Sequence, residues 1–198
     1  MRILHLITSP RKSQSYSVQL GNAIVDKLTA AHPGSTVVVR DLAAAPFPHL
    51  EEAQIQSVFT PEENRTAEQA QAIAHSDEAI AELMAADVVV IGAPMYNFSI
   101  TSNLKSWIDH ISRRGKTFRY SENGPEGLVK GKKIYLAIST GGVYSEGVMK
   151  VYDYTENYLR AVLGFMGMTD VTVVRAEGLS IPGMQDKAME KAYAAITV

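Results

Sequence analysis

The chain has no cysteine among its 198 residues and no excess of positive charge. Without thiols it can form no disulfide, no thiolate metal site and no cysteine nucleophile. Its 19 Lys and Arg stand against 21 Asp and Glu, which gives a net charge of −2. Nucleic acid and anionic membranes are therefore poor partners, because both select basic surfaces.

Long apolar runs are also missing. The longest, Val88–Met95, is interrupted by Gly92 and Pro94, and a membrane helix needs ~20 apolar residues. The segment Met1–Thr8 is too short for a signal peptide and has no small-residue cleavage site. These features predict a cytoplasmic protein. The length and the 46% hydrophobic content fit one globular domain over residues 1–198.

Apolar periodicity predicts five strands that alternate with five helices. The expected strands are Arg2–Thr8, Thr36–Arg40, Asp87–Gly92, Lys133–Ser139 and Val171–Arg175. The expected helices are Ser17–Ala31, Thr66–Ala86, Thr101–Ser112, Val151–Met166 and Pro182–Thr197. All strands except the second are nearly continuous apolar runs, which is typical of strands covered on both faces.

This alternation predicts an α/β fold, namely a doubly wound five-stranded parallel sheet with helices on both faces. Two insertions, Ala43–Arg65 and Gly115–Gly131, are longer than ordinary connections. They are either binding loops or surface decoration.

Ligands of such sheets bind beyond the carboxyl ends of the strands, so the loops after the first, third and fourth strands matter most. The first loop, Ser9–Ser17, contains four serines directly before a helix. Hydroxyls, free N–H groups and the helix dipole favour a phosphate there. Alternatively, Ser15 or Ser17 only caps the helix. The loop has neither G-x-x-x-x-G-K-[ST] nor G-x-G-x-x-G, which argues against a P-loop nucleotidase and a dinucleotide pyrophosphate site.

The second loop, Pro94–Ile100, places Tyr96 and Phe98 around Asn97. These aromatics either edge a flat ligand or belong to the core. In the third loop, Gly141 and Gly142 allow positive φ and close approach of the backbone to a ligand, or simply make a turn. Together, the three loops are typical of a site for a mononucleotide with a flat ring system.

Five sequence strings are more specific than these loops. They are Arg40–Ala43 (RDLA), Ala93–Phe98 (APMYNF), Phe118–Leu128 (FRYSENGPEGL), Ser139–Gly142 (STGG) and Leu163–Val171 (LGFMGMTDV). With them, nearly the whole chain resembles the bacterial FMN-dependent NAD(P)H azoreductases and quinone reductases, which have the flavodoxin-like fold. The resemblance implies one FMN-binding domain, one FMN per subunit and NADH or NADPH as electron donor. It also implies planar acceptors such as quinones and azo dyes, and a homodimer with shared active sites.

The resemblance assigns the site residues by motif. The FMN-binding residues would be Ser9, Ser15, Tyr16 and Ser17 at the phosphate, Met95, Tyr96, Asn97 and Phe98 along the isoalloxazine and ribityl chain, and Ser139, Thr140, Gly141 and Gly142 at the pyrimidine end. The substrate-binding residues would be Asn97, Phe98, Tyr120 and Phe165, with Tyr120 and Phe165 in part from the second subunit.

No residue is assigned as a catalytic acid, base or metal ligand, because a flavin carries the hydride chemistry itself. Tyr16, Thr140 and Tyr144 depart from the residues common in the family. The changes at Thr140 and Tyr144 are expected to alter the shape and charge of the acceptor pocket. The implied reaction is a ping-pong exchange, in which the nicotinamide leaves before the acceptor takes two electrons.

Other functions are compatible with parts of the pattern. A non-catalytic flavodoxin-type electron carrier is disfavoured by the low net charge, since such carriers tend to be strongly acidic. An FMN-binding sensor is a further alternative. A phosphorylation-receiver domain needs acidic residues after its first and third strands. The chain has Thr8–Pro10 and Ala93–Met95 there, which excludes this class. Of the sequence features of a dinucleotide-binding dehydrogenase, the chain has only Asp41 after the second strand and lacks the glycines. Asp41 is expected to begin a turn.

Scattered histidines and basic residues are expected to have ordinary roles. His5 and His110 are predicted to be structural, and Arg113 and Arg114 to lie at a solvated helix end rather than at a 2′-phosphate.

Overall fold

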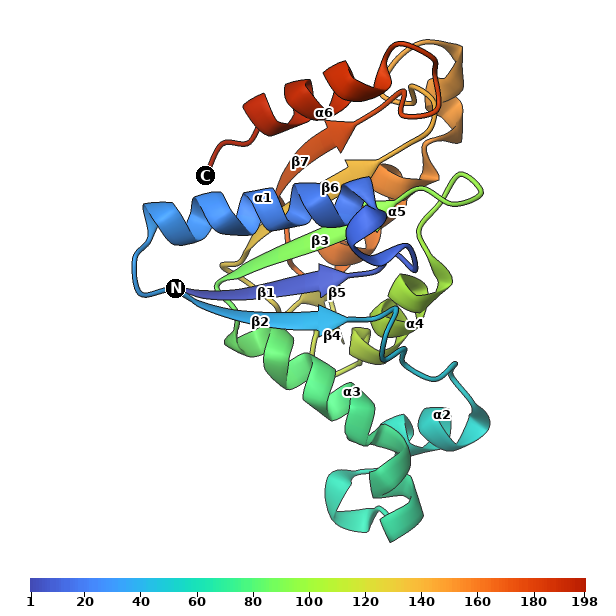
Figure 1. The fold of residues 1–198 in the computed structure, drawn as a ribbon. Helices are drawn as coiled ribbons and strands as arrows, with labels where there is room; N and C mark the ends of the chain where they lie inside the picture. Colours follow the sequence, from blue (N-terminus) through green and yellow to red (C-terminus); the bar gives the residue numbers. More distant parts are fainter.

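The computed structural model describes all residues 1–198 and has a main sheet of five parallel strands (Figure 1). The strands are β1 Arg2–Ile7, β2 Thr36–Asp41, β3 Val88–Pro94, β6 Lys133–Ser139 and β7 Asp170–Ala176. Their order is β2-β1-β3-β6-β7. The chain moves outward in one direction from β1 and in the other from β3, so the switch point lies between these two strands. The doubly wound parallel sheet is confirmed.

Six α-helices accompany the sheet. They are α1 Tyr16–Ala31, α2 Glu52–Phe59, α3 Ala67–Ala85, α4 Ser102–Ile111, α5 Tyr154–Phe165 and α6 Gln185–Ala194. Helices α1 and α6 cover one face of the sheet, and α3, α4 and α5 cover the other (Figure 1). No helix has both the length and the apolar character needed to cross a membrane.

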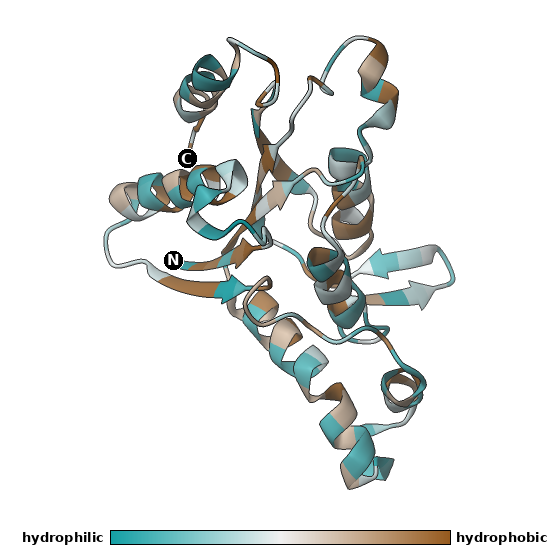
Figure 2. Cartoon of the chain, turned by 45° about the vertical axis from the view of Figure 1, so that its right-hand side comes forward, coloured by the Kyte–Doolittle hydropathy of each residue, from teal (hydrophilic) through white to brown (hydrophobic).

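Two apolar cores lie on the two faces of the sheet, and β3 contributes to both. Val90 packs in the core under α1 and α6, whereas its neighbour Ile91 packs with Trp107 of α4 in the other core. Alternate β3 side chains point to opposite faces, so a strand covered on both sides is apolar throughout. Figure 2 shows the apolar residues gathered on the strands.

The edge strands are less buried than the central ones. Val37, Val38 and Val39 of β2 are exposed, and β7 is only half-buried along most of its length. Coverage on both faces is nevertheless correct for β1, β3, β6 and β7, since in β7 Val171 and Val173 pack against one core and Val174 and Ala176 belong to the other. An apolar run does not distinguish a central strand from an edge strand.

The two insertions contain regular structure that the sequence analysis missed. Ala43–Arg65 includes α2, whose start is stabilised by a capping box between Glu51 and Gln54. Gly115–Gly131 forms an antiparallel hairpin of β4 Phe118–Ser121 and β5 Gly124–Gly127. Figure 2 shows this hairpin extending from the body of the chain, outside the main sheet.

The start of α5 is later than predicted. Asp153 caps the helix by accepting hydrogen bonds from the Thr155 and Glu156 N–H groups. The preceding residues Val148–Tyr152 form a 3₁₀ turn.

His5 lies in the middle of β1, buried against α1. A Cβ atom at Gly21 of α1 would be only 2.7 Å from His5 Nε2, so the helix needs glycine at this crossing. Burial lowers the pKa of His5 to about 4, and the Asp26 carboxylate offsets this only in part. The imidazole is therefore neutral near pH 7, in line with its predicted structural role.

The lowered pKa predicts how stability depends on pH. In the unfolded chain His5 binds a proton near its ordinary pKa of 6.5, whereas the folded chain resists protonation down to about 4. Its contribution to stability is therefore complete above pH 6.5 and is lost as the pH falls from 6.5 to 4. Between pH 7.5 and pH 5, wild type should lose roughly 2 kcal/mol more unfolding free energy than His5→Leu, measured by urea denaturation. Equal losses in the two proteins would contradict this prediction.

Candidate functional site

Four loops meet at the carboxyl edge of the sheet and line a cavity of about 440 Å³, called here the serine-loop cavity. Its lining residues are Arg11, Ser15, Tyr16, Pro94, Met95, Tyr96, Ser139, Thr140, Gly141, Leu179, Ser180 and Gln185. The structure thus brings seven of the twelve predicted cofactor residues together around one cavity. Its lining contains an arginine but no carboxylate, so the cavity suits an anionic ligand.

The start of α1 supplies buried hydroxyl groups. Ser9, Ser15 and Ser17 are all buried, and the Ser15 and Ser17 Oγ atoms lie 3.0 Å apart. Ser15 occupies the N-cap position, but its side chain makes no capping hydrogen bond. Of the two candidates, Ser15 is thus the N-cap residue, but its hydroxyl pairs with that of Ser17 and not with a helix N–H group. The first N–H groups of the helix have no acceptor within it, which leaves them available to an anion.

A glycine allows this helix start to approach the sheet closely. A Cβ atom at Gly92 of β3 would lie 3.1 Å from the Ser17 carbonyl oxygen. The Thr8 hydroxyl donates to the Gly92 carbonyl at 2.6 Å, and the Asn103 amide donates to the Thr8 carbonyl at 2.9 Å. In the sequence, Gly92 only interrupts an apolar run, and nothing there indicates this positioning role.

The loop after β3 makes a tight turn with unusual backbone geometry. Tyr96 and Ser99 exchange N–H···O hydrogen bonds of 2.9 and 3.1 Å. Between them, Asn97 and Phe98 have φ of +49° and +69°, as a two-residue hairpin turn requires. Positive φ is strained for a phenylalanine, and such strain is often kept at functional sites.

The aromatic residues of this turn face outward. Tyr96 and Phe98 are 38% and 43% exposed, so they are not core aromatics. The Phe98 ring lies 6.2 Å from that of Tyr144 and 5.4 Å from that of Tyr152, measured between centroids. The side chains of Phe98, Tyr144 and Tyr152 form an aromatic group at the surface, called here the rim cluster.

The loop after β6 is held by the loop after β7. Thr140 N–H donates to the Ala176 carbonyl at 3.0 Å, and Ser180 N–H donates to the Gly141 carbonyl at 2.9 Å. Neither Gly141 nor Gly142 has a positive φ, so that expected use of glycine is wrong. Gly141 instead permits close packing, because a Cβ atom there would lie 2.8 Å from Ser180 Oγ and the serine side chain would have to shift.

Residues after β7 were missed by the sequence analysis. Leu179, Ser180 and Gln185 line the serine-loop cavity, and the Gln185 amide donates to the Tyr16 hydroxyl. A signal was available, since the carboxyl ends of parallel strands share one edge and the loop after the fifth strand must lie there too.

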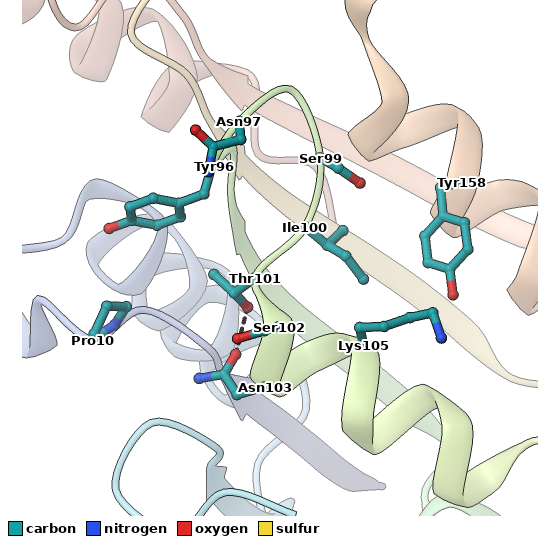
Figure 3. Close-up of a pocket in the computed structure, with 10 residues that line it drawn as sticks. All are labelled: Pro10, Tyr96, Asn97, Ser99, Ile100, Thr101, Ser102, Asn103, Lys105 and Tyr158. Atoms are coloured by element: carbon teal, nitrogen blue, oxygen red, sulfur yellow. Dashed lines mark hydrogen bonds between the residues drawn. The ribbon is translucent and has the colours of Figure 1, made fainter. Parts of the chain in front are cut away.

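A second cavity of about 720 Å³ lies on the other side of Tyr96, beside α4. In this α4 cavity, Tyr96 and Pro10 lie on one side and Lys105 and Tyr158 on the other (Figure 3). Asn97 also lines it. Burial raises the pKa of Tyr158 despite the nearby Lys105 ammonium, so its hydroxyl stays protonated at neutral pH. Tyr96 therefore separates two open spaces at one edge of the sheet.

Tyr120 and Phe165 line neither of these two cavities. They pack instead around Phe118, whose ring centroid is 5.8 Å from that of Tyr120 and 4.6 Å from that of Phe165. Tyr120 is 61% exposed on the hairpin. Within one chain, the structure does not bring them together with Asn97 and Phe98.

Arg113 and Asp41 both have structural partners. Arg113 is buried and forms an ion pair with Asp77, so the predicted solvated helix end is wrong for this residue. The Asp41 carboxylate accepts hydrogen bonds from the Ala43 and Ala44 N–H groups at 2.9 and 3.1 Å, which is the predicted turn.

Comparisons with known proteins agree with the fold. A family model described as a flavodoxin-like fold matches residues 1–198. The chain is 47% identical to the FMN-dependent NADH:quinone oxidoreductase of Mesorhizobium japonicum, over 99% of this chain and 94% of that protein. It is 50% identical to the FMN-dependent NADH:quinone oxidoreductase 6 of Burkholderia lata, over 98% and 97%. The azoreductase structure from Bacillus anthracis matches with a TM-score of 0.91 and 33% identity, over 98% and 95%.

The close contact at Gly92 predicts a site-specific effect of added volume. Gly92→Ala should lower the unfolding free energy by about 1–3 kcal/mol, because the Ser17 carbonyl cannot move without shifting α1. The matched control is Gly164→Ala in α5, where a Cβ atom would meet nothing within 4 Å. That change should raise stability by about 0.5–1 kcal/mol. Urea denaturation compares the two, and equal effects of the same sign would contradict the prediction.

Proposed function

The chain belongs to the flavodoxin-like fold family, and from that premise we infer that it is an FMN-dependent NADH:quinone oxidoreductase. It uses FMN as cofactor and NADH as electron donor, as its relatives' names state for those proteins. Its likeness to an azoreductase extends the acceptors to azo compounds. The observation that carries the inference is the serine-loop cavity, where Ser15 at the start of α1, with the buried Ser17 hydroxyl beside it, borders a space lined by three further loops.

The residues of this cavity fit FMN. Ser9, Ser15 and Ser17 would hold the phosphate with their hydroxyls, assisted by the free N–H groups of the first helical turn, including that of Tyr16. Residues Met95–Phe98 and Ser139–Gly142 would lie along the ribityl chain and the ring system. The absence of carboxylates from the lining supports the choice of an anionic cofactor.

When bound, FMN would supply the two-electron redox chemistry that links NADH to the acceptor. The protein binds and orients the reactants and shields them from water. The rigid turn at Asn97 and Phe98 would fix a polar group and an aromatic ring beside the place where donor and acceptor bind in turn. No side chain needs to act as acid or base, because water can supply the protons.

We further propose that residues 1–198 act as one FMN-binding domain in the cytoplasm and assemble as a homodimer. The partner's Tyr120 and the partner's Phe165 would then complete the wall of the acceptor pocket near Asn97. Two observations support this arrangement. Tyr120 is exposed on a hairpin away from its own chain's cavities, and the α4 cavity leaves open space beside Asn97.

Reconstitution tests the function directly. The purified protein should bind FMN with a yellow spectrum and oxidise NADH when a naphthoquinone is added. Initial rates at several quinone concentrations should give parallel double-reciprocal lines, as ping-pong exchange requires. Bound flavin without NADH oxidation would favour the sensor or electron-carrier alternatives. A protein that takes up no FMN would overturn the proposal, and intersecting lines would overturn its ping-pong order.

Tyr120→Ala tests the shared acceptor pocket. Removing the ring should raise KM for the naphthoquinone about tenfold and change the FMN dissociation constant less than about twofold. Tyr193→Ala on α6 is the matched control, because Tyr193 is 37% exposed and lines neither cavity. Loss of bound flavin from Tyr120→Ala would show that the assignment is wrong, and sedimentation of a monomer would remove the dimer from the proposal.

A further inference from the structure

A single guanidinium at the end of β7 joins three carboxylates that lie outside both site cavities. Arg175 forms ion pairs with Asp153, with Glu156 and, at 3.3 Å, with Glu177. The Arg175 and Glu177 side chains are each 14% exposed and that of Asp153 is 7% exposed. Burial alone would raise the pKa of Glu156, but hydrogen bonds from Arg175 and Arg160 lower it overall. The Glu156 carboxylate is therefore charged. Arg175 is the residue common to all three ion pairs.

One arm of this network leads to Phe98. Asp153 caps α5 by accepting hydrogen bonds of 3.1 Å from the Thr155 and Glu156 N–H groups. Tyr154, which lies between Asp153 and Thr155 in the chain, donates its N–H to the Phe98 carbonyl at 3.1 Å. Arg175 thus fixes the helix start that holds the strained turn in place.

The other arm leads to Tyr144. Glu177 Oε1 accepts hydrogen bonds from the Tyr144 and Ser145 N–H groups at 2.9 and 3.0 Å, and Oε2 accepts from the Ser145 hydroxyl. Beyond this anchor the chain is exposed, with Gly147 at φ +67° and Val148 87% exposed. The position of Tyr144 therefore depends on Glu177, which Arg175 contacts directly.

The two arms end on the two rings of the rim cluster whose centroids lie 6.2 Å apart. We propose that Arg175 is a positioning residue that sets the placement of Phe98 against Tyr144, and thereby the fit of a planar acceptor ring beside Phe98 and Asn97. This role rests on the proposed function. Without the guanidinium, three neighbouring carboxylates would repel one another and turn toward water, which releases both arms. Lysine is a poor replacement because a single ammonium cannot fork toward several carboxylates.

FMN retention is expected to depend little on Arg175. The Ser139–Gly142 segment is fastened separately, by backbone hydrogen bonds to residues 176–180. The serine hydroxyls at the start of α1 belong to another loop. The proposal therefore separates acceptor fit from cofactor binding, which an experiment can measure independently.

The test compares Arg175→Met, Arg175→Lys and Glu177→Ala with wild type. Glu177→Ala releases only the Tyr144 arm and keeps the proposal testable if Arg175→Met does not fold. Arg160→Met is the matched control, because Arg160 pairs with Glu156 alone and is 44% exposed. In cofactor-free protein, trypsin should cut after Lys150 faster in Arg175→Met and Glu177→Ala, by about fivefold, because the segment opens locally more often.

In FMN-loaded protein, the same two variants should raise KM for a naphthoquinone about fivefold, with kcat and the FMN dissociation constant within about twofold. Arg175→Lys should be intermediate, and Arg160→Met should match wild type.

Faster cleavage with an unchanged KM would overturn the proposal by leaving Arg175 a purely structural role, and unchanged cleavage would overturn the anchoring itself. If wild type takes up no FMN, the proposed function fails and the role in acceptor fit fails with it. The cleavage rates then still decide whether Arg175 anchors the segment.

Discussion

The parallel pairing of β1 with β3 is the constraint on which the site depends. Connections leave this pair in opposite directions across the sheet, so the loops after the two strands are not covered by a crossing helix. The contact between Gly92 and the first turn of α1 then brings three buried serine hydroxyls to the same edge. A side chain at position 92 would separate the helix from the strand and move the hydroxyls away from the loop that carries Tyr96.

Around this pair of strands, hydrogen bonds and ion pairs hold the strained and exposed parts of the loops in place. The left-handed backbone at Asn97 and Phe98 costs free energy, which the surrounding hydrogen bonds must offset. The anchors differ between parts of the site. Backbone hydrogen bonds fasten the Ser139–Gly142 loop, whereas a charged network around Arg175 fastens the residues that border the acceptor side. Under the proposed function, cofactor binding and acceptor choice would therefore rest on different interactions at the same edge of the sheet.

Errors in the sequence analysis have identifiable physical causes. The hairpin Phe118–Gly127 was missed because its strands are short, contain Pro125 and two glycines, and are not buried against a core. The apolar run in β7 predicted a strand covered on both faces, which is correct, but it did not indicate that β7 is an edge strand and only partly buried. Ser15 or Ser17 was predicted to cap α1, and Ser15 does occupy the N-cap position, but its hydroxyl pairs with the Ser17 hydroxyl in the folded chain.

The sequence by itself determined the strand and helix alternation, the parallel sheet and the three loops that carry the motif residues. Hydrophobic periodicity and turn chemistry are local properties, and they are encoded within a few residues of one another. Only the tertiary structure decided that Leu179, Ser180 and Gln185 join the cavity and that Arg175 connects Phe98 with Tyr144. It also showed that Tyr120 lies away from Asn97 in its own chain. These relations join residues distant in sequence, and they depend on how strands are ordered and helices packed.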